Sequence, residues 1–307
     1  MPPDHIQPEV WFHNLGIYFE NVPRVAFSVF GLEIFWYAIL IVTGIITAYF
    51  MAVIYAGRSG QDKTLYTDLL ILGIVTSFIG LRTYYMIFAW DNYRGQPLLR
   101  AFLNVREGGL AIYGGILGAI LAGIIMSIVK KVPFSTLADT CIPSILVGQV
   151  IGRFGNFFNK EAFGSFTENI FAMRIRVDAA RYITPELWAQ TVMVNGAEYI
   201  QVHPTFLYEA MFNFLLMIAL ILYRPYRRFP GELLPLYMLG YGTARFFIEG
   251  LRTDQLPFFD TGFAASQIVS VVFGIIGLIW LVAGYSLGRR PVPAKPRAAK
   301  QSGAKKR

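Results

Sequence analysis

Long apolar stretches alternate with short polar ones along most of this chain. Seven stretches of about 20 residues are long enough to cross roughly 30 Å of hydrocarbon as helices; they are residues 30–56, 67–89, 110–129, 137–157, 206–223, 232–250 and 266–287. Barrel strands alternate polar and apolar positions over about ten residues, which is a different pattern. The pattern predicts an all-α polytopic membrane protein with about seven transmembrane helices.

Composition supports this class. Hydrophobic residues make up 55% of the chain and charged residues only 15%, against about 25% charged in ordinary soluble domains. We therefore divide the chain into an outer N-terminal segment (1–29), helices one to four (30–157), an outer arm (158–205), helices five to seven (206–287) and a basic tail (288–307).

Residues 158–205 differ from the rest because they are polar and mixed. They contain a strand-like run, IFAMRIRV, and a turn signal at Asn195-Gly196. The segment is too long for a plain loop, so we expect an outer arm or small cap over the helices.

The loops indicate the orientation. With the N-terminus outside, the inner connections and the tail carry fifteen Lys and Arg residues, and the outer segments carry nine. Eight of the fifteen lie in the tail, but part of the outer count lies in the long arm, which translocates largely regardless of charge. An outer N-terminus and a cytoplasmic C-terminus are favoured, and no removable signal peptide is predicted.

Ionisable residues inside apolar spans are costly and point to partners or function. Arg245, Glu249 and Arg252 lie at i, i+4 and i+7, on one helical stripe. An ion pair between Arg245 and Glu249, in which the two charges neutralise each other, would explain two of these three residues. The second arginine leaves positive charge over, which favours an anionic ligand such as a phosphate.

Arg153, Asn156 and Asn159 repeat this logic in GQVIGRFGNFFNKEAFG. Gly148 and Gly152 form a GxxxG pattern, for which helix packing is the simpler use. Packing alone gives the arginine and the carboxamides no partners.

Three further features have a simpler interpretation beside the functional one. Tyr113 lies between glycine pairs in EGGLAIYGGILG and is either an interfacial tyrosine or a hydroxyl facing a ligand. His203 begins the fifth span in VHPTFLYEA and is either locally satisfied or functional. Cys141, the single cysteine, is a small core residue in our interpretation.

No metal or cofactor is implied. One cysteine and three histidines, two of them near the N-terminus, do not form a plausible ligand set. No Gly-rich nucleotide loop follows a strand and the basic surplus lies mostly in the tail, so nucleotide and nucleic-acid partners are not expected. An anion or lipid transporter and a passive lipid-binding protein stay open on the residues alone.

Several segments together resemble the prolipoprotein diacylglyceryl transferase family of the bacterial inner membrane. They are GRFGNFFNKEAFG, YGTARFFIEGLRTDQ, HPTFLYE, EGGLAIYGGILG and FWYAI. The resemblance implies transfer of the diacylglyceryl group of phosphatidylglycerol to the lipobox cysteine thiol of a preprolipoprotein, with glycerol phosphate released. The substrates would be that lipid, drawn from the membrane, and the preprolipoprotein signal peptide.

The resemblance also assigns site residues. Catalytic roles would fall to Arg153, Arg245, Glu249 and Tyr113. Substrate binding would involve Asn156, Asn159, Glu161, Gly164, Tyr37, Arg252, His203, Asp139 and Glu209.

One position departs from many members, which have a histidine assigned as the catalytic base where this chain has Tyr113. A tyrosine with a pKa of about 10 is a poor base at neutral pH. Tyr113 therefore positions substrate, acts as a phenolate stabilised by arginines, or leaves the thiol proton to another group.

Overall fold

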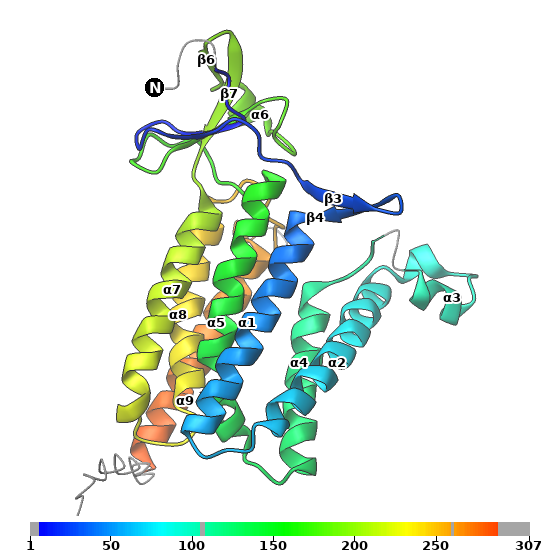
Figure 1. Ribbon diagram of the computed structural model, residues 1–307, viewed down its shortest axis with the longest axis vertical. Helices are drawn as coiled ribbons and strands as arrows, with labels where there is room; N and C mark the ends of the chain where they lie inside the picture. The colour runs from blue at the N-terminus through cyan, green and yellow to red at the C-terminus, as the bar shows by residue number, and fades with distance from the viewer. Residues whose placement is uncertain (1–5, 105–107, 259–260, 288–307) are drawn as a thin grey trace, which may run out of the picture.

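The computed structural model describes residues 6–104, 108–258 and 261–287. Within these residues, seven helices of at least 18 residues form a bundle, and a small sheet covers one end of it (Figure 1). The helices are α1 (Trp36–Arg58), α2 (Thr64–Phe88), α4 (Ile112–Val129), α5 (Phe134–Asn159), α7 (Thr205–Tyr223), α8 (Leu233–Leu251) and α9 (Ala265–Ser286). Shorter helical elements are η1 (Trp90–Tyr93), α3 (Leu98–Leu103), α6 (Pro185–Trp188) and η2 (Arg224–Tyr226).

Six of the seven long helices are long and apolar enough to cross a membrane, which confirms the expected polytopic helical class. The helix outside this group is α8, which carries Arg245 and Glu249 and packs much of its surface inside the bundle. The basic tail, 288–307, lies outside the described residues.

Helix α5 lies at the centre of the bundle, where it packs against α1, α7 and α8, and α9 covers α8. Glycines allow the close crossings. A Cβ atom on Gly148 of α5 would lie 3.3 Å from the carbonyl oxygen of Gly44 in α1, so the GxxxG pattern serves helix packing, the simpler of its two uses. Helices α2 and α4 pair with each other and stand to one side (Figure 1).

The sheet joins two distant parts of the chain. Its order is β2-β1-β5-β7-β6, all antiparallel, with β1 (Val10–Phe12), β2 (Ile17–Phe19), β5 (Met173–Arg176), β6 (Val192–Val194) and β7 (Ala197–Val202). Asn195 and Gly196 form the β6-β7 turn with φ angles of 49° and 77°, as a type I′ turn requires. The N-terminal segment and residues 158–205 thus share one core, although the sequence suggested two separate segments.

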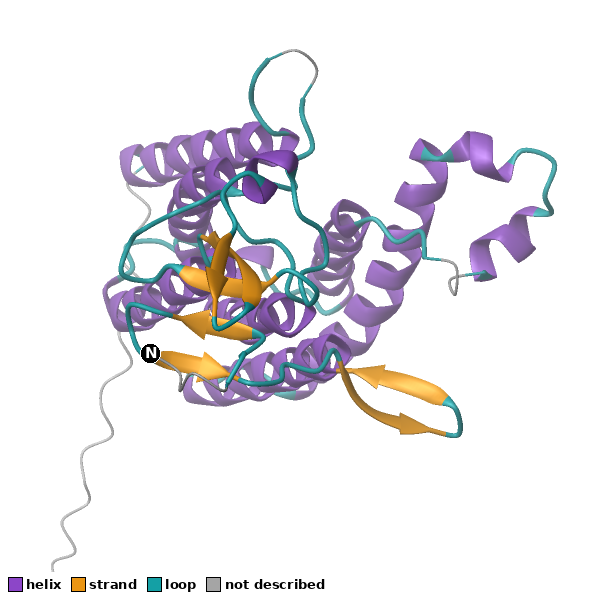
Figure 2. Ribbon diagram, turned by 90° about the horizontal axis from the view of Figure 1, so that it is seen from above, coloured by secondary structure: helices purple, strands orange, loops and turns teal. Residues whose placement is uncertain are grey.

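The predicted start of the first span is wrong. Residues 30–35 do not enter α1, because Leu32–Phe35 forms strand β4 and pairs with β3 (Val25–Val29) through a turn at Phe30 and Gly31. Both turn residues have positive φ, at 48° and 79°, which ends any helix there. The resulting hairpin stands out from the side of the bundle (Figures 1 and 2).

Candidate functional site

A single buried carboxylate joins two arginines from different helices. Glu209 of α7, 3% exposed, lies with Oε1 2.6 Å from Nη2 of Arg153 in α5. Its Oε2 accepts a hydrogen bond of 2.8 Å from Nη1 of Arg245 in α8. The two guanidinium groups therefore converge on one carboxylate near the end of the bundle that lies toward the sheet, and they remain 24% and 15% exposed.

Arg245 and Glu249 pair on α8 as their spacing predicts, whereas Arg252 joins them from the extended residue that follows the helix. Arg245 Nη2 lies 2.5 Å from Glu249 Oε2, and Arg252 Nη1 lies 3.7 Å from the same oxygen. Arg252 also binds Asp254 through two hydrogen bonds of 2.8 and 2.6 Å. Burial disfavours the charge of Arg252, but the bond to Asp254 and the neighbouring carboxylates outweigh it, so its pKa is raised.

This pairing corrects the charge argument made from the sequence. Three arginines (Arg153, Arg245, Arg252) face three carboxylates (Glu209, Glu249, Asp254), so the cluster carries no surplus positive charge. The cluster does offer N–H groups with fixed directions. A guanidinium has five N–H donors, and each carboxylate here accepts only one or two of them, so donors remain for a ligand. An anion would be bound by these donors rather than by net charge.

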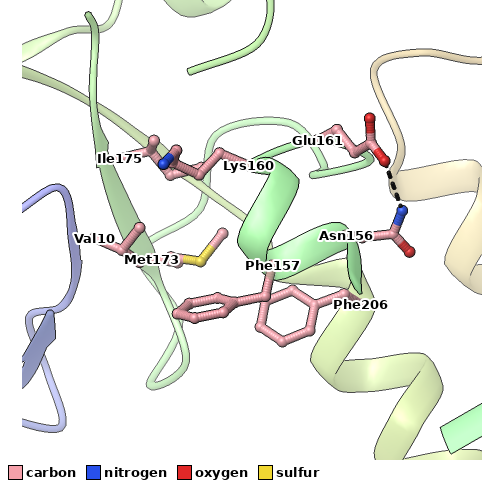
Figure 3. A pocket seen from close by; sticks show the side chains of 8 residues that line it. All are labelled: Val10, Asn156, Phe157, Lys160, Glu161, Met173, Ile175 and Phe206. Atoms are coloured by element: carbon pink, nitrogen blue, oxygen red, sulfur yellow. Dashed lines mark hydrogen bonds between the residues drawn. The ribbon is translucent and has the colours of Figure 1, made fainter. Parts of the chain in front are cut away.

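The end of α5 has one polar and one apolar face. Glu161 Oε1 accepts hydrogen bonds from Asn156 Nδ2 at 3.2 Å and from Asn159 Nδ2 at 2.9 Å, and Arg181 binds its other oxygen. Figure 3 shows Asn156 and Glu161 on one side of the end of α5, and Val10, Met173 and Ile175 of the sheet on the other side. The hollow between the end of α5 and the sheet is too narrow for a water molecule, so it is not a ligand site. The side chains around it instead pack the arm against the bundle.

Tyr37 lies at the start of α1 and packs on the same region of α5. A Cβ atom on Gly155 would come within 2.4 Å of the Tyr37 ring, so only glycine permits this contact. Tyr37 is 39% exposed and lies beside the turn that carries Arg153 and Asn156.

Gly164 lies where the arm meets α8. Its N–H donates to the His203 carbonyl at 2.9 Å, and it forms a bridge with Arg252. A Cβ atom there would lie 2.7 Å from the carbonyl oxygen of Leu251, so a larger residue would push the arm away from α8.

The ring of His203 is held by two neighbours. Asn169 Nδ2 donates to the Tyr208 hydroxyl at 2.7 Å, and that hydroxyl lies 3.2 Å from His203 Nδ1. Asn169 Nδ2 also lies 3.3 Å from His203 Nδ1. Because an amide N–H can only donate, Nδ1 is the acceptor and the ring proton lies on Nε2. Burial lowers the pKa of His203 and favours this neutral form.

Asp139 does not join these residues. It lies near the start of α5 and accepts backbone hydrogen bonds from Gly231 at 2.8 Å and Leu233 at 3.1 Å. Fourteen residues of helix separate it from Arg153, about 21 Å at 1.5 Å per residue. In the structure Asp139 satisfies free N–H groups at the start of α8, and its predicted role in substrate binding stays a prediction.

Tyr113 belongs to a helix outside the central group. It lies at the start of α4, 38% exposed, with its ring 6.4 Å from that of Tyr84. Arg245 and Glu249 are near enough to act on it electrostatically.

Sequence reasoning missed three members of the site. Tyr241 donates to Glu209 Oε1 at 3.3 Å, Asp254 pairs with Arg252, and Arg181 pairs with Glu161. Tyr241 could have been found, since it lies four residues before Arg245 on the same stripe. Arg181 carries no such signal, because it lies twenty residues from Glu161 in an irregular part of the arm.

Comparison with known proteins gives a consistent result. Residues 24–283 match a family model described as "Prolipoprotein diacylglyceryl transferase". Proteins named phosphatidylglycerol–prolipoprotein diacylglyceryl transferase are 40% identical in Clostridium novyi over 84% of this chain and 94% of the relative, and 38% identical in Finegoldia magna over 83% and 93%. A Bacillus cereus relative is 35% identical over 88% of this chain and 94% of its own length.

Proposed function

This chain belongs to the prolipoprotein diacylglyceryl transferase family, and we propose that its arginine–carboxylate cluster is where the transfer takes place. In the reaction, the lipobox cysteine thiol of a preprolipoprotein attacks glycerol C3 of phosphatidylglycerol. A C–S bond forms, the C–O bond to the phosphate breaks, glycerol phosphate leaves, and the thiol proton passes to a base.

The convergence of Arg153 and Arg245 on Glu209 carries this proposal. Displacement of a phosphate requires donors fixed on the oxygens that gain negative charge in the transition state. Glu209 binds both guanidinium groups, and each group keeps part of its surface exposed. Their remaining N–H groups would bind the lipid phosphate, and Glu249 would keep Arg245 in place.

The Asn156–Asn159–Glu161 group and the His203 ring would bind the parts of the substrates that extend out of the bundle. The two carboxamides orient Glu161, and Tyr37, Gly164 and Arg252 lie at the same junction of bundle and arm. With its ring proton on Nε2, His203 would act there as a hydrogen-bond donor and not as the base.

We also propose that α8 is a seventh span. Its first residue, Leu233, binds Asp139 near the start of α5, and Arg252, which follows its last residue, pairs with Gly164, just beyond the end of α5. It thus lies alongside α5 from the level of Asp139 to the end near the sheet. The polar residues that lower its hydropathy are the ones paired inside the cluster, so they are not presented to lipid.

Seven spans place the two ends of the chain on opposite sides. Together with the loop charges, this supports an outer N-terminus, an outer sheet and a cytoplasmic C-terminus in a bacterial inner membrane. The cluster would then open on the outer side.

The test uses purified protein in nanodiscs that contain phosphatidylglycerol, with a lipobox peptide as acceptor. We expect a diacylglyceryl thioether by mass spectrometry, and a loss of at least about 100-fold in rate for Arg153→Ala and for Arg245→Ala, since fixed donors of this kind contribute about 10²–10³ in rate. Arg94→Ala, which changes an exposed residue just after η1, is the matched control. Wild-type rates in both cluster variants would place the reaction elsewhere.

A further inference from the structure

Below the arginine cluster, on the side away from the sheet, a second layer of polar side chains lies one helical turn away. Helices α5 and α7 run in opposite directions and meet at the Arg153–Glu209 pair. Gln149 lies four residues before Arg153, and Asn213 four residues after Glu209. Because residues four apart lie on one helix face, both side chains come to the same level, on the cytoplasmic side of the pair in the proposed orientation.

This layer contains polar atoms that no described residue satisfies. Asn213 is fully buried, and neither its Nδ2 nor its Oδ1 has a hydrogen-bond partner among the described residues. Oε1 of Gln149 is also buried and, within the same part of the chain, without a partner. Buried carboxamides in native proteins are nearly always bonded to protein or to ordered water.

The layer is connected to the site above it. Gln149 Nε2 donates to the Tyr237 hydroxyl at 2.8 Å, and the Tyr237 ring stacks on Tyr241 with centroids 5.3 Å apart. Tyr241 in turn donates to Glu209. Below the layer the core is apolar, with Leu146 and Met217 buried one turn further on.

We propose that Asn213, Gln149 and the Tyr237 hydroxyl bind internal water between α5, α7 and α8. A water molecule makes about three hydrogen bonds to buried polar groups, and this layer offers both donors and acceptors. The bound water fixes the Tyr237–Tyr241 stack and so positions Glu209 between its two arginines. Asn213 and Gln149 are then positioning residues for the proposed reaction.

Radiolytic labelling in ¹⁸O-water tests the water site directly, because hydroxyl radicals formed from bound water modify neighbouring side chains. In wild-type protein in nanodiscs, Tyr237 should be labelled at least about five-fold faster than Tyr66, which is buried at 2% exposure against 7% for Tyr237. Asn213→Leu should reduce labelling of Tyr237 to the level of Tyr66. Equal labelling of the two tyrosines in wild type would overturn the water site.

The positioning role has its own readout and rests on the proposed function. Asn213→Leu should lower kcat for transfer about ten-fold and change KM for phosphatidylglycerol less than two-fold, while Met217→Leu, one turn further along α7, should change neither. Gln149→Met gives a second test where Asn213→Leu does not fold. Loss of the label with unchanged kcat would overturn the positioning role, whereas a wild-type protein without transfer activity would contradict the proposed function and leave the labelling result standing.

Discussion

Among single residues, Glu209 holds the arrangement together because each of its oxygens binds an arginine from another helix. We expect Glu209→Gln to lower the transfer rate at least about 100-fold. It should also destabilise the protein by about 3 kcal/mol, since removing one partner from a buried charge group leaves the other uncompensated. Activity and thermal unfolding in nanodiscs measure the two effects. Glu33→Gln, on the exposed β3-β4 hairpin, should change neither, and a fully active Glu209→Gln would contradict the proposed clamp.

Tyr113 does not act as an obligatory base in our interpretation. It comes from α4, outside the central group of helices, and its ring is only half buried. Tyr113→Phe removes the hydroxyl and keeps the ring, so we expect it to retain activity within about ten-fold of wild type. Tyr113→His restores the residue found in many family members and is the companion variant. A loss of several orders of magnitude in Tyr113→Phe would assign the proton transfer to this hydroxyl.

The neutral His203 ring predicts a dependence of stability on pH. Its pKa is lower in the folded protein than the ordinary value of about 6.5, so the unfolded chain binds the proton more readily. The stabilisation is complete above about pH 6.5 and is lost as pH falls through the lowered folded value. His13 shifts in the same direction. The difference in Tm between wild type and His203→Gln therefore isolates His203, and it should shrink between about pH 7.5 and pH 5.

The sequence could predict pairs within one helix but not pairs between helices. The i, i+4 rule pairs Arg245 with Glu249 from their spacing alone. Nothing in the spacing of Arg153 and Glu209, which are 56 positions apart, indicates that they touch. Asp139 shows a second limit, because the sequence does not indicate that this buried acid binds the N–H groups at the start of α8, at the other end of α5 from Arg153.

At the scale of helices and strands, the length of the hydrophobic stretches predicted the long helices reliably. Each of the seven apolar stretches contains a long helix, and the bounds differ by a few residues in most of them. The exception is the start of α1, where the apolar strands β3 and β4 are exposed on both sides and so lack the alternation that identifies a half-buried strand. The pairing of β1 with β5 joins residues more than 160 positions apart, so no local sequence pattern could predict it.

Close glycine contacts between α2 and α4 lead to a prediction at this scale. A Cβ atom on Gly80 would lie 2.1 Å from the carbonyl oxygen of Gly114, whereas one on Gly73 of the same helix would meet no atom of the described residues within 4 Å. Gly80→Leu should therefore separate the two helices and lower stability by about 1–3 kcal/mol, as overpacking does. Gly73→Leu is the matched control. Thermal unfolding in nanodiscs gives the comparison, and equal Tm values for the two variants would refute the close crossing.

At the scale of the whole molecule, the number of spans decides on which side of the membrane each end lies. Helix α8 is the element in question, because its hydropathy excludes it from the six candidate spans although it lies alongside α5 from the level of Asp139 to the end near Gly164. Six spans would put β3 and the end of α9 on the same side. Seven put them on opposite sides, with the sheet and the arginine cluster facing outward.

Single cysteines distinguish these two topologies. The native thiol is removed by Cys141→Ser, and Ser28→Cys on β3 and Ser286→Cys at the end of α9 each introduce one exposed thiol. A membrane-impermeant maleimide applied to spheroplasts should label Ser28→Cys at once and Ser286→Cys only after lysis, because an odd number of crossings separates them. Labelling of both before lysis would mean that α8 does not cross, and the reverse order would mean that the cluster faces the cytoplasm. The second result would conflict with the loop charges, since the fifteen basic residues assigned to the inner side would then lie outside.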